Sequence, residues 1–162
     1  MIEQEIASLA QFILNNANNS EPYYSEIPMD FIVPSVYFPP PEVDTYGETF
    51  RTFRLRYYWN VKFFHQTVED AYALAMGVLV AFKKAKHLIP LINENGEPTG
   101  EYLRVNDPSI KKLDDGAYHI KLEWDSRRPY DNTESAYMQN IILNLWKNGN
   151  LYKQIPVSPQ NN

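Results

Sequence analysis

A single stretch, residues 52–86, most constrains the fold of this chain, because its hydrophobic pattern changes period near the middle. Over residues 52–63 apolar and polar side chains alternate strictly, which is the pattern of a β-strand with one buried side and one solvent-facing side. The apolar set is Phe53, Leu55, Tyr57, Trp59, Val61 and Phe63. Thr67 and Asp70 then form the start signal of a helix, and apolar residues recur at intervals of three and four in the rest of the stretch. The sequence therefore predicts a long strand that leads directly into a long helix able to cover its apolar side.

Other segments give weaker signals of the same two kinds. Apolar residues at helical spacing predict a first helix over residues 2–16, and alternation over residues 117–125 predicts a second strand that pairs with the long one. Apolar stripes between residues 132 and 147, ended by Asn148 and Gly149, predict a third helix. Shorter strands are expected over residues 31–38, 88–92 and 102–105.

Together these elements predict an α+β fold, with a mostly antiparallel sheet of about four to five strands and helices packed on one face. The length of 162 residues and the 44% hydrophobic content suit one globular domain with a real core. We expect this single domain to cover residues 1–150. Residues 151–162, which contain two prolines and a polar end, are expected to form a C-terminal tail.

Composition excludes several classes of protein. The sequence has no cysteine, which rules out disulfides, thiolate metal sites and cysteine nucleophiles and favours an intracellular protein. A net charge of −5 provides no overall basic surface for nucleic acid. The start of the chain is acidic and unlike a signal peptide, and the longest apolar run, residues 71–82, is too short to span a bilayer. We therefore expect neither a disulfide-stabilised secreted scaffold nor a membrane protein.

Sequence signatures of catalysis and of cofactor binding are absent. The chain contains no Gly-rich phosphate loop, no G-x-S-x-G and no H-E-x-x-H motif. His119 and Glu123 share one face of a predicted strand, but strand geometry separates them by about 13 Å, too far to bind one metal ion. We therefore expect no catalytic residue, no metal site and no cofactor, and we expect that the protein is not an enzyme.

Aromatic content and one basic strand face indicate a chain that binds other proteins. The sequence holds 12 tyrosines, 8 phenylalanines and 3 tryptophans, more than a core of this size needs, and tyrosine and tryptophan are favoured in interfaces. Arg54, Arg56 and Lys62 make the polar side of the long strand basic, which suits an acidic partner or a phosphate backbone; a solvated strand face is the alternative interpretation. Candidate interface residues are Tyr37, Phe38, Tyr46, Arg54, Arg56, Lys62, Arg127, Arg128 and Tyr130.

The order of these segments resembles that of the tail terminator proteins of tailed phages and related phage-tail-like particles. The resemblance covers about residues 1–130 and depends on order and pattern. It is carried by an N-terminal amphipathic helix followed by PSVYF, TFRLRYYWNVKFF, TVEDAYALAMGVLVAFKK and DGAYHIKLEWDSRRPY. Residues 132–162 are not part of the matching pattern.

The resemblance implies a structural virion protein located in the tail or neck and made in the host cytoplasm. Members of that family form a ring, commonly a hexamer, that caps the tail tube, stops its polymerisation and offers a surface for head joining; they are not enzymes and carry no cofactor. The expected partners are copies of the chain itself, the tail tube protein and a head-side connector protein. Nucleic acid is expected only as DNA that passes through the ring lumen.

Three alternative functions remain open at the level of sequence. The nearest is another head–tail connector or neck protein. A small-ligand-binding or lipid-binding module could use the aromatic sheet as a pocket wall, and a hydrolase with an unusual site is the weakest alternative.

Overall fold

The computed structural model describes residues 2–24, 26–113, 116–131, 141–147 and 150–157. The chain divides into two compact units, Met1–Pro129 and Tyr130–Asn162. In chain order the elements of the first unit are α1 (Ile2–Asn15), β1 (Glu21–Tyr24), β2 (Ser35–Phe38), β3 (Glu42–Gly47), β4 (Thr52–Phe64), α2 (Val68–Lys84), β5 (Leu88–Ile92), β6 (Pro98–Lys112) and β7 (Tyr118–Pro129). The second unit contains β8 (Ile141–Lys147) and β9 (Asn150–Val157).

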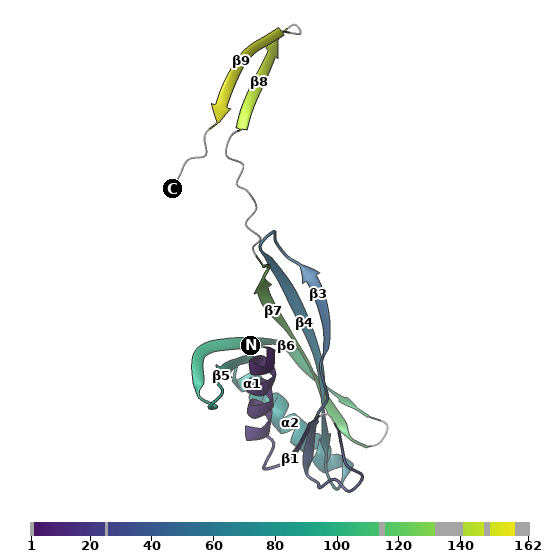
Figure 1. Cartoon of the computed structure of the whole chain (residues 1–162). Coiled ribbons are helices and arrows are strands. Elements are labelled where there is room, and N and C mark those ends of the chain that lie inside the picture. Colours follow the sequence, from purple (N-terminus) through teal and green to yellow (C-terminus); the bar gives the residue numbers. More distant parts are fainter. Residues whose placement is uncertain (1, 25, 114–115, 132–140, 148–149, 158–162) are drawn as a thin grey trace. The chain divides into compact units, whose positions relative to one another are not determined.

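Strand β4 is the long strand that the sequence predicts, and it lies within the sheet of the first unit between β2 and β7 (Figure 1). It pairs antiparallel with β7 from Thr52–Pro129 to Phe63–Tyr118. Its other side is shared by two strands, because β3 pairs with the first part of β4 and β2 with the last part. The continuous order of the seven-stranded sheet is β1-β2-β4-β7-β6-β5, and β3 lies off this path. The β1–β2 pair is parallel and the other pairs are antiparallel, so the sheet is mixed.

The expected α+β class, with four to five strands and helices packed on one face, is wrong. The described residues are mostly strand and contain two helices, and the sheet curls into a half-barrel instead of forming a flat layer under helices. Figure 1 shows β6 bending around α1 to reach β5. The physical cause is strand length: β4, β6 and β7 have 13, 15 and 12 residues, so strand twist accumulates along them. An extra residue in β6, between Asn106 and Ser109, adds a bulge and a further bend.

The predicted third helix is also wrong where the structure describes it. Ile141–Lys147 forms β8, which pairs antiparallel with β9, so part of the expected tail is a strand as well. Residues 132–140 of the expected helix lie outside the described residues. The hairpin spans residue 150, at which we placed the end of the domain, and that boundary stays a prediction.

The predicted strand-to-helix passage is confirmed. Thr67 caps α2, and its side chain accepts a hydrogen bond from the backbone N–H of Asp70. The apolar sides of β4 and β7 form the core together with α2 and with the inner side of α1. Tyr57 and Trp124 stack there with ring centroids 4.8 Å apart, and Trp59 lies 6.1 Å from Trp124. Other buried core residues are Leu9, Ile13, Val61, Phe63, Leu74, Val78, Phe82, Ile89, Val105, Ile120 and Leu122.

Neither helix among the described residues is long and apolar enough to cross a membrane.

Candidate functional site

The candidate residues of β4 lie on the side of the sheet that faces away from the core. Alternation sends Tyr57, Trp59, Val61 and Phe63 into the interior and leaves their neighbours half-buried on the outer side. The outer residues of β4 meet those of β7 in fixed pairs. These pairs are Arg54 with Arg127, Arg56 with Asp125, Tyr58 with Glu123, Asn60 with Lys121, and Lys62 with His119.

Near the β3–β4 turn the outer side carries an arginine cluster, which consists of Tyr46, Arg54, Arg56 and Asp125. Arg56 donates to both carboxylate oxygens of Asp125, from Nε at 2.8 Å and from Nη2 at 3.2 Å. Arg54 Nη1 lies 3.5 Å from the same carboxylate. Both guanidinium groups lie over the Tyr46 ring, at 5.4 and 5.6 Å from its centroid. The structure therefore brings three predicted interface residues together around an acidic partner that the sequence analysis did not include.

Charge pairing in this cluster shifts the pKa values of Asp125 and Arg56. The hydrogen bond from Arg56 holds the pKa of Asp125 below its ordinary value, and the bond to Asp125 raises the pKa of Arg56. Arg127 makes a separate outer pair with Glu48 of the β3–β4 turn, with Nε and Oε2 2.8 Å apart. The arginines on this part of the face are thus neutralised within the chain.

The opposite end of the same face carries a lysine cluster, which consists of Lys62, Lys111, Lys121 and His119. Lys62 and Lys111 flank His119 from β4 and β6. Burial, followed by the charges of Lys111 and Lys62, lowers the pKa of His119. Among the described residues no salt bridge joins Lys62, Lys111 or Lys121 to a carboxylate. The sequence analysis identified only Lys62, because the other members come from distant strands and meet only through the sheet register.

The remaining predicted interface residues are not brought together. Phe38 is buried and packs against Trp59, with centroids 5.5 Å apart. Tyr37 is half-buried beneath Lys62, whose Nζ lies 5.7 Å from the ring centroid. Tyr130 is exposed at the start of the second unit. Arg128, next to the outward-facing Arg127, points to the inner side of the sheet.

Arg128 belongs to a buried polar cluster around Glu5 of α1, which the sequence analysis missed. Glu5 accepts hydrogen bonds from Trp124 Nε1 at 3.0 Å and from Ser126 Oγ at 2.7 Å, and Arg128 Nη2 lies 3.4 Å from its carboxylate. Two sequence patterns could have revealed it. Glu5 precedes the buried Leu9 by four residues on the apolar side of the helix, and Ser126 and Arg128 continue the inward alternation of Trp124.

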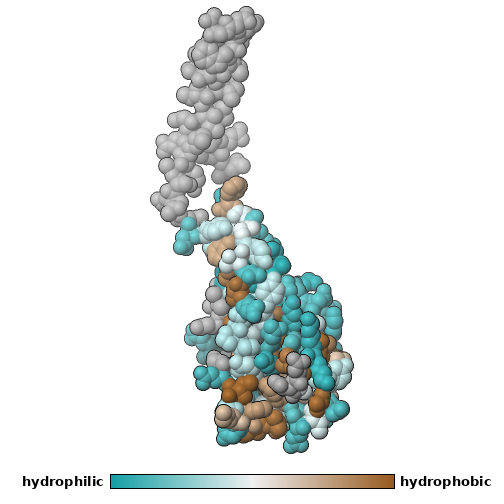
Figure 2. All heavy atoms as spheres, turned by 90° about the vertical axis from the view of Figure 1, so that its right-hand side faces the viewer, coloured by the Kyte–Doolittle hydropathy of each residue, from teal (hydrophilic) through white to brown (hydrophobic). Residues whose placement is uncertain are grey.

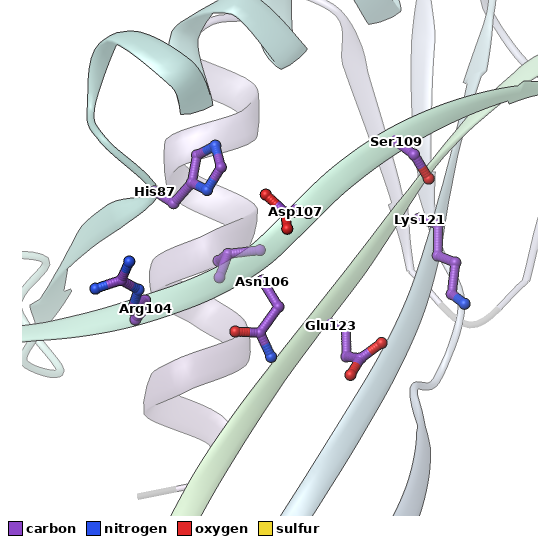
Figure 3. A pocket seen from close by; sticks show the side chains of 8 residues that line it. His87, Arg104, Asn106, Asp107, Ser109, Lys121 and Glu123 are labelled. Carbon is purple, nitrogen blue, oxygen red and sulfur yellow. The ribbon is translucent and has the colours of Figure 1, made fainter.

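A polar pocket of about 460 Å³ lies beside the lysine cluster (Figure 3). Asn106, Asp107 and Ser109 from the β6 bulge line it, together with Lys121 and Glu123 from β7. His87, which follows α2, and Arg104 complete the labelled side chains. The pocket presents charges of both signs. It is not the aromatic-walled pocket that a lipid-binding alternative would use.

Within the part of the chain that the structure describes, no group of three histidine, cysteine or carboxylate side chains is placed to hold a metal ion.

These features describe a strand-rich protein with a charged, accessible sheet face, and comparison with known proteins places it in a family. No family model matches the sequence. Over 122 residues the chain is 37% identical to XkdJ, a protein of the phage-like element PBSX of Bacillus subtilis (strain 168), and the match covers 75% of this chain and 84% of XkdJ. It is 36% identical over 133 residues to the uncharacterized protein YqbJ of the same organism, covering 82% of this chain and 90% of YqbJ. The chain therefore belongs to the family of phage-element proteins that includes XkdJ.

A structural comparison matches a chain of a native gene transfer agent virion with a TM-score of 0.48 and 11% identity, over 80% of this chain and 97% of that one. The expectation of a phage protein is confirmed by the sequence relatives.

Proposed function

We propose that this chain is a structural protein of a phage-type particle and acts as a tail terminator. Copies of it form a ring that caps the end of the tail tube, stops its polymerisation and offers a surface for head joining. The observation that carries this proposal is membership of the family of XkdJ, a protein of a phage-like element. The ordered segments that resemble terminator proteins supply the finer assignment.

Several surfaces of the first unit support this proposal. Ring closure needs heterologous contacts, in which one patch of a subunit meets a different patch of the next. The exposed β3 strand and its turn into β4 form a projecting hairpin, whereas β1 and β5 end the continuous order of the sheet on its two sides. The lysine cluster adds a positive area to a chain of net charge −5.

The proposed partners are other copies of the chain, the tail tube protein and a head-side connector, with location in the tail or neck of the particle. DNA is proposed only as a molecule that passes through the lumen. The chain is proposed to be a binding protein without enzymatic activity or cofactor, since the charged groups of its outer face neutralise one another or lie open to partners.

Native mass spectrometry of the purified chain, combined with tube polymerisation, tests this proposal. We expect a closed ring of defined subunit number. When the chain is added to polymerising tube protein, electron microscopy should show shorter tubes that carry a ring at one end. A chain that stays monomeric at every concentration and leaves tube length unchanged would contradict the proposal. Capture on purified portal complexes instead of tube ends would assign it to the head side.

The polar pocket favours a second candidate function, the binding of a small charged molecule. His87 Nε2 is buried beside it and has no hydrogen-bond partner among the described residues. Native mass spectrometry distinguishes this candidate, because a monomer with a co-purified small molecule would support it. A ring whose mass equals that of its subunits alone would contradict the binding of a small molecule.

A further inference from the structure

An exposed phenylalanine marks the turn between β3 and β4. The Phe50 side chain is fully exposed, and an isolated ring of this size is costly to leave in water. The turn that carries it is ordered by Thr49, whose Oγ1 accepts hydrogen bonds from the backbone N–H groups of Arg51 at 3.1 Å and Thr52 at 3.0 Å. The salt bridge between Glu48 and Arg127 ties the same turn to β7. A large apolar side chain held out by an ordered turn has the character of an interface anchor.

An apolar groove of about 540 Å³ lies elsewhere on the same unit, along α1. One side of this helix packs into the core through Leu9 and Ile13, whereas the groove side stays open. Its lining is Ile6, Ala7, Ala10, Gln11, Leu14, Asn15 and Tyr24. Small alanines at its centre and larger apolar groups around them leave room for an aromatic ring.

The charges beside the two features are complementary. Arg51 directly follows Phe50 in the turn. Glu26 is exposed two residues after Tyr24, and its backbone N–H donates to the Tyr24 carbonyl at 2.7 Å, which keeps Glu26 close to this groove residue. An arginine next to the anchor and a carboxylate near the groove favour one orientation of docking.

The turn and the groove cannot meet within one copy. Both belong to the compact unit Met1–Pro129, and the β3–β4 turn lies at one end of the sheet while α1 and β1 lie toward the other (Figure 1). Two complementary patches at different places on identical chains make a heterologous contact, which propagates from copy to copy and closes when the rotation allows. The occupant that fits the groove is therefore a second copy of this chain.

We propose that the β3–β4 turn of each copy inserts Phe50 into the α1–Tyr24 groove of its neighbour, with Arg51 facing Glu26. This contact rests on the proposed function and supplies the subunit interface of the ring. It also accounts for the open apolar side of α1.

Cross-linking in the cysteine-free background tests the contact directly. Full-length Arg51→Cys and Gln11→Cys chains, which keep Phe50, are mixed and treated with a short thiol-specific cross-linker. We expect a covalent dimer in the mixture and none with either chain alone. Lys112→Cys, an exposed position on β6, replaces Gln11→Cys as the control and is expected to give no dimer with Arg51→Cys. Dimers of Arg51→Cys with itself would overturn the proposal, as would a Gln11→Cys chain that cross-links to tube protein instead of to a copy.

Self-association measured by sedimentation velocity gives an independent test. Phe50→Ala should weaken the subunit contact by about thirtyfold, the change that corresponds to the roughly 2 kcal/mol of an interface hot spot. Met29→Ala is the matched control, because Met29 is also a fully exposed apolar residue, and it should leave association unchanged. Arg51→Glu should weaken association, and adding Glu26→Arg should restore part of it.

The outcomes separate this contact from the proposed function. Wild-type protein that forms rings, together with Phe50→Ala protein that forms them equally well, would overturn the contact and leave the terminator proposal standing. Wild-type protein that never associates would overturn both.

Discussion

The Glu5 carboxylate is buried against β7, so its hydrogen bonds determine how α1 is held. It receives Trp124 Nε1 and Ser126 Oγ, and Arg128 compensates its charge. Its place in the first turn of α1 also puts a negative charge near the positive end of the helix dipole. The cluster therefore combines packing with a specific orientation of the helix.

Removal of this carboxylate should be among the more damaging single changes. We predict that Glu5→Ala lowers the free energy of unfolding by about 2–4 kcal/mol, because it removes the carboxylate that faces the half-buried Arg128 and leaves the Trp124 and Ser126 donors without this acceptor. Urea unfolding followed by circular dichroism measures the change. Glu94→Ala, which removes a carboxylate from an exposed loop, is the control and should change stability by less than about 0.5 kcal/mol. Equal stability of the two variants would show that the cluster contributes nothing.

His119 gives the outer face a predictable pH dependence. Its pKa is lowered in the folded state by burial and by Lys111 and Lys62, so as pH falls below the ordinary value of 6.5 the unfolded chain takes up the proton first. Stability is therefore unaffected above this value and decreases as pH falls below it. We predict that His119→Gln flattens this decrease between pH 7.5 and 5, as measured by urea unfolding at several pH values. Curves of the same slope for both proteins would contradict the assignment.

Residue-level sequence patterns predicted which strand residues are buried, but not which charges meet. Alternation placed Tyr57 and Trp59 inside and Arg54 and Arg56 outside, and the structure agrees. Arg127 and Arg128 are both among the candidate interface residues, although the same alternation sends neighbours to opposite sides of a sheet. The partnership of Arg56 with Asp125 depends on a strand register that sequence alone does not reveal.

At the scale of elements, a glycine in helix α2 and a glycine in the turn before β7 have opposite effects on stability. Gly77 lies in the middle of α2, and a Cβ there would meet no atom within 4 Å. Gly116 has φ +77°, and a Cβ there would lie 3.1 Å from Val68 Cγ2. The first glycine weakens its element, whereas the second is required by its turn.

A matched pair of alanine substitutions tests this difference. We predict that Gly77→Ala raises the free energy of unfolding by about 0.5–1 kcal/mol, because alanine is the better helix former. Gly116→Ala should lower it by about 1–2 kcal/mol, because alanine is strained at positive φ and crowds Val68. Thermal and urea unfolding measure both changes. Shifts of the same sign in the two variants would refute the explanation.

The start of α2 and the second unit show when element prediction succeeds and when it does not. Thr67 and Asp70 form a capping signal with a single structural meaning, and the helix begins where they predict. Asn148-Gly149 has two meanings, since it suits the end of a helix and also the turn of a hairpin. The β-branched and aromatic residues of Ile141–Lys147 favour the strand, and this preference outweighs the helical spacing of the apolar residues.

At the scale of the whole molecule, the curl of the sheet could not be predicted from residue patterns. Periodicity identified β4, α2 and β7, and it predicted that β4 and β7 pair. The closure of the sheet into a half-barrel depends on twist summed over long strands and on the bulge in β6, neither of which leaves a periodic signal.

The candidate site could not be predicted for a similar reason. The strand register of β3, β4, β6 and β7 brings together charged residues that are far apart in the sequence. Figure 2 shows one side of the first unit, where hydrophilic residues cover much of the surface and hydrophobic residues gather mainly at the lower end of the view.

The two charge clusters should respond differently to substitution, and this difference tests which of them binds a partner. The arginine cluster is paired internally, so we predict that Arg54→Glu with Arg56→Glu lowers the free energy of unfolding by about 1–3 kcal/mol, because it sets like charges beside Asp125. Lys62 and Lys111 form no salt bridge with a carboxylate among the described residues, so the fold and the ring should persist in the Lys62→Glu, Lys111→Glu variant. If the lysine cluster faces an acidic surface at the tube end, the lysine variant should lose affinity for tubes at low salt. The affinity of the wild type for tubes should also fall as salt screens the attraction.

Tube co-sedimentation across a range of salt concentrations measures both effects. Equal affinity of the lysine variant and the wild type at low salt would move the tube contact away from this face, and the β3–β4 hairpin and α1 would then be the surfaces to test next.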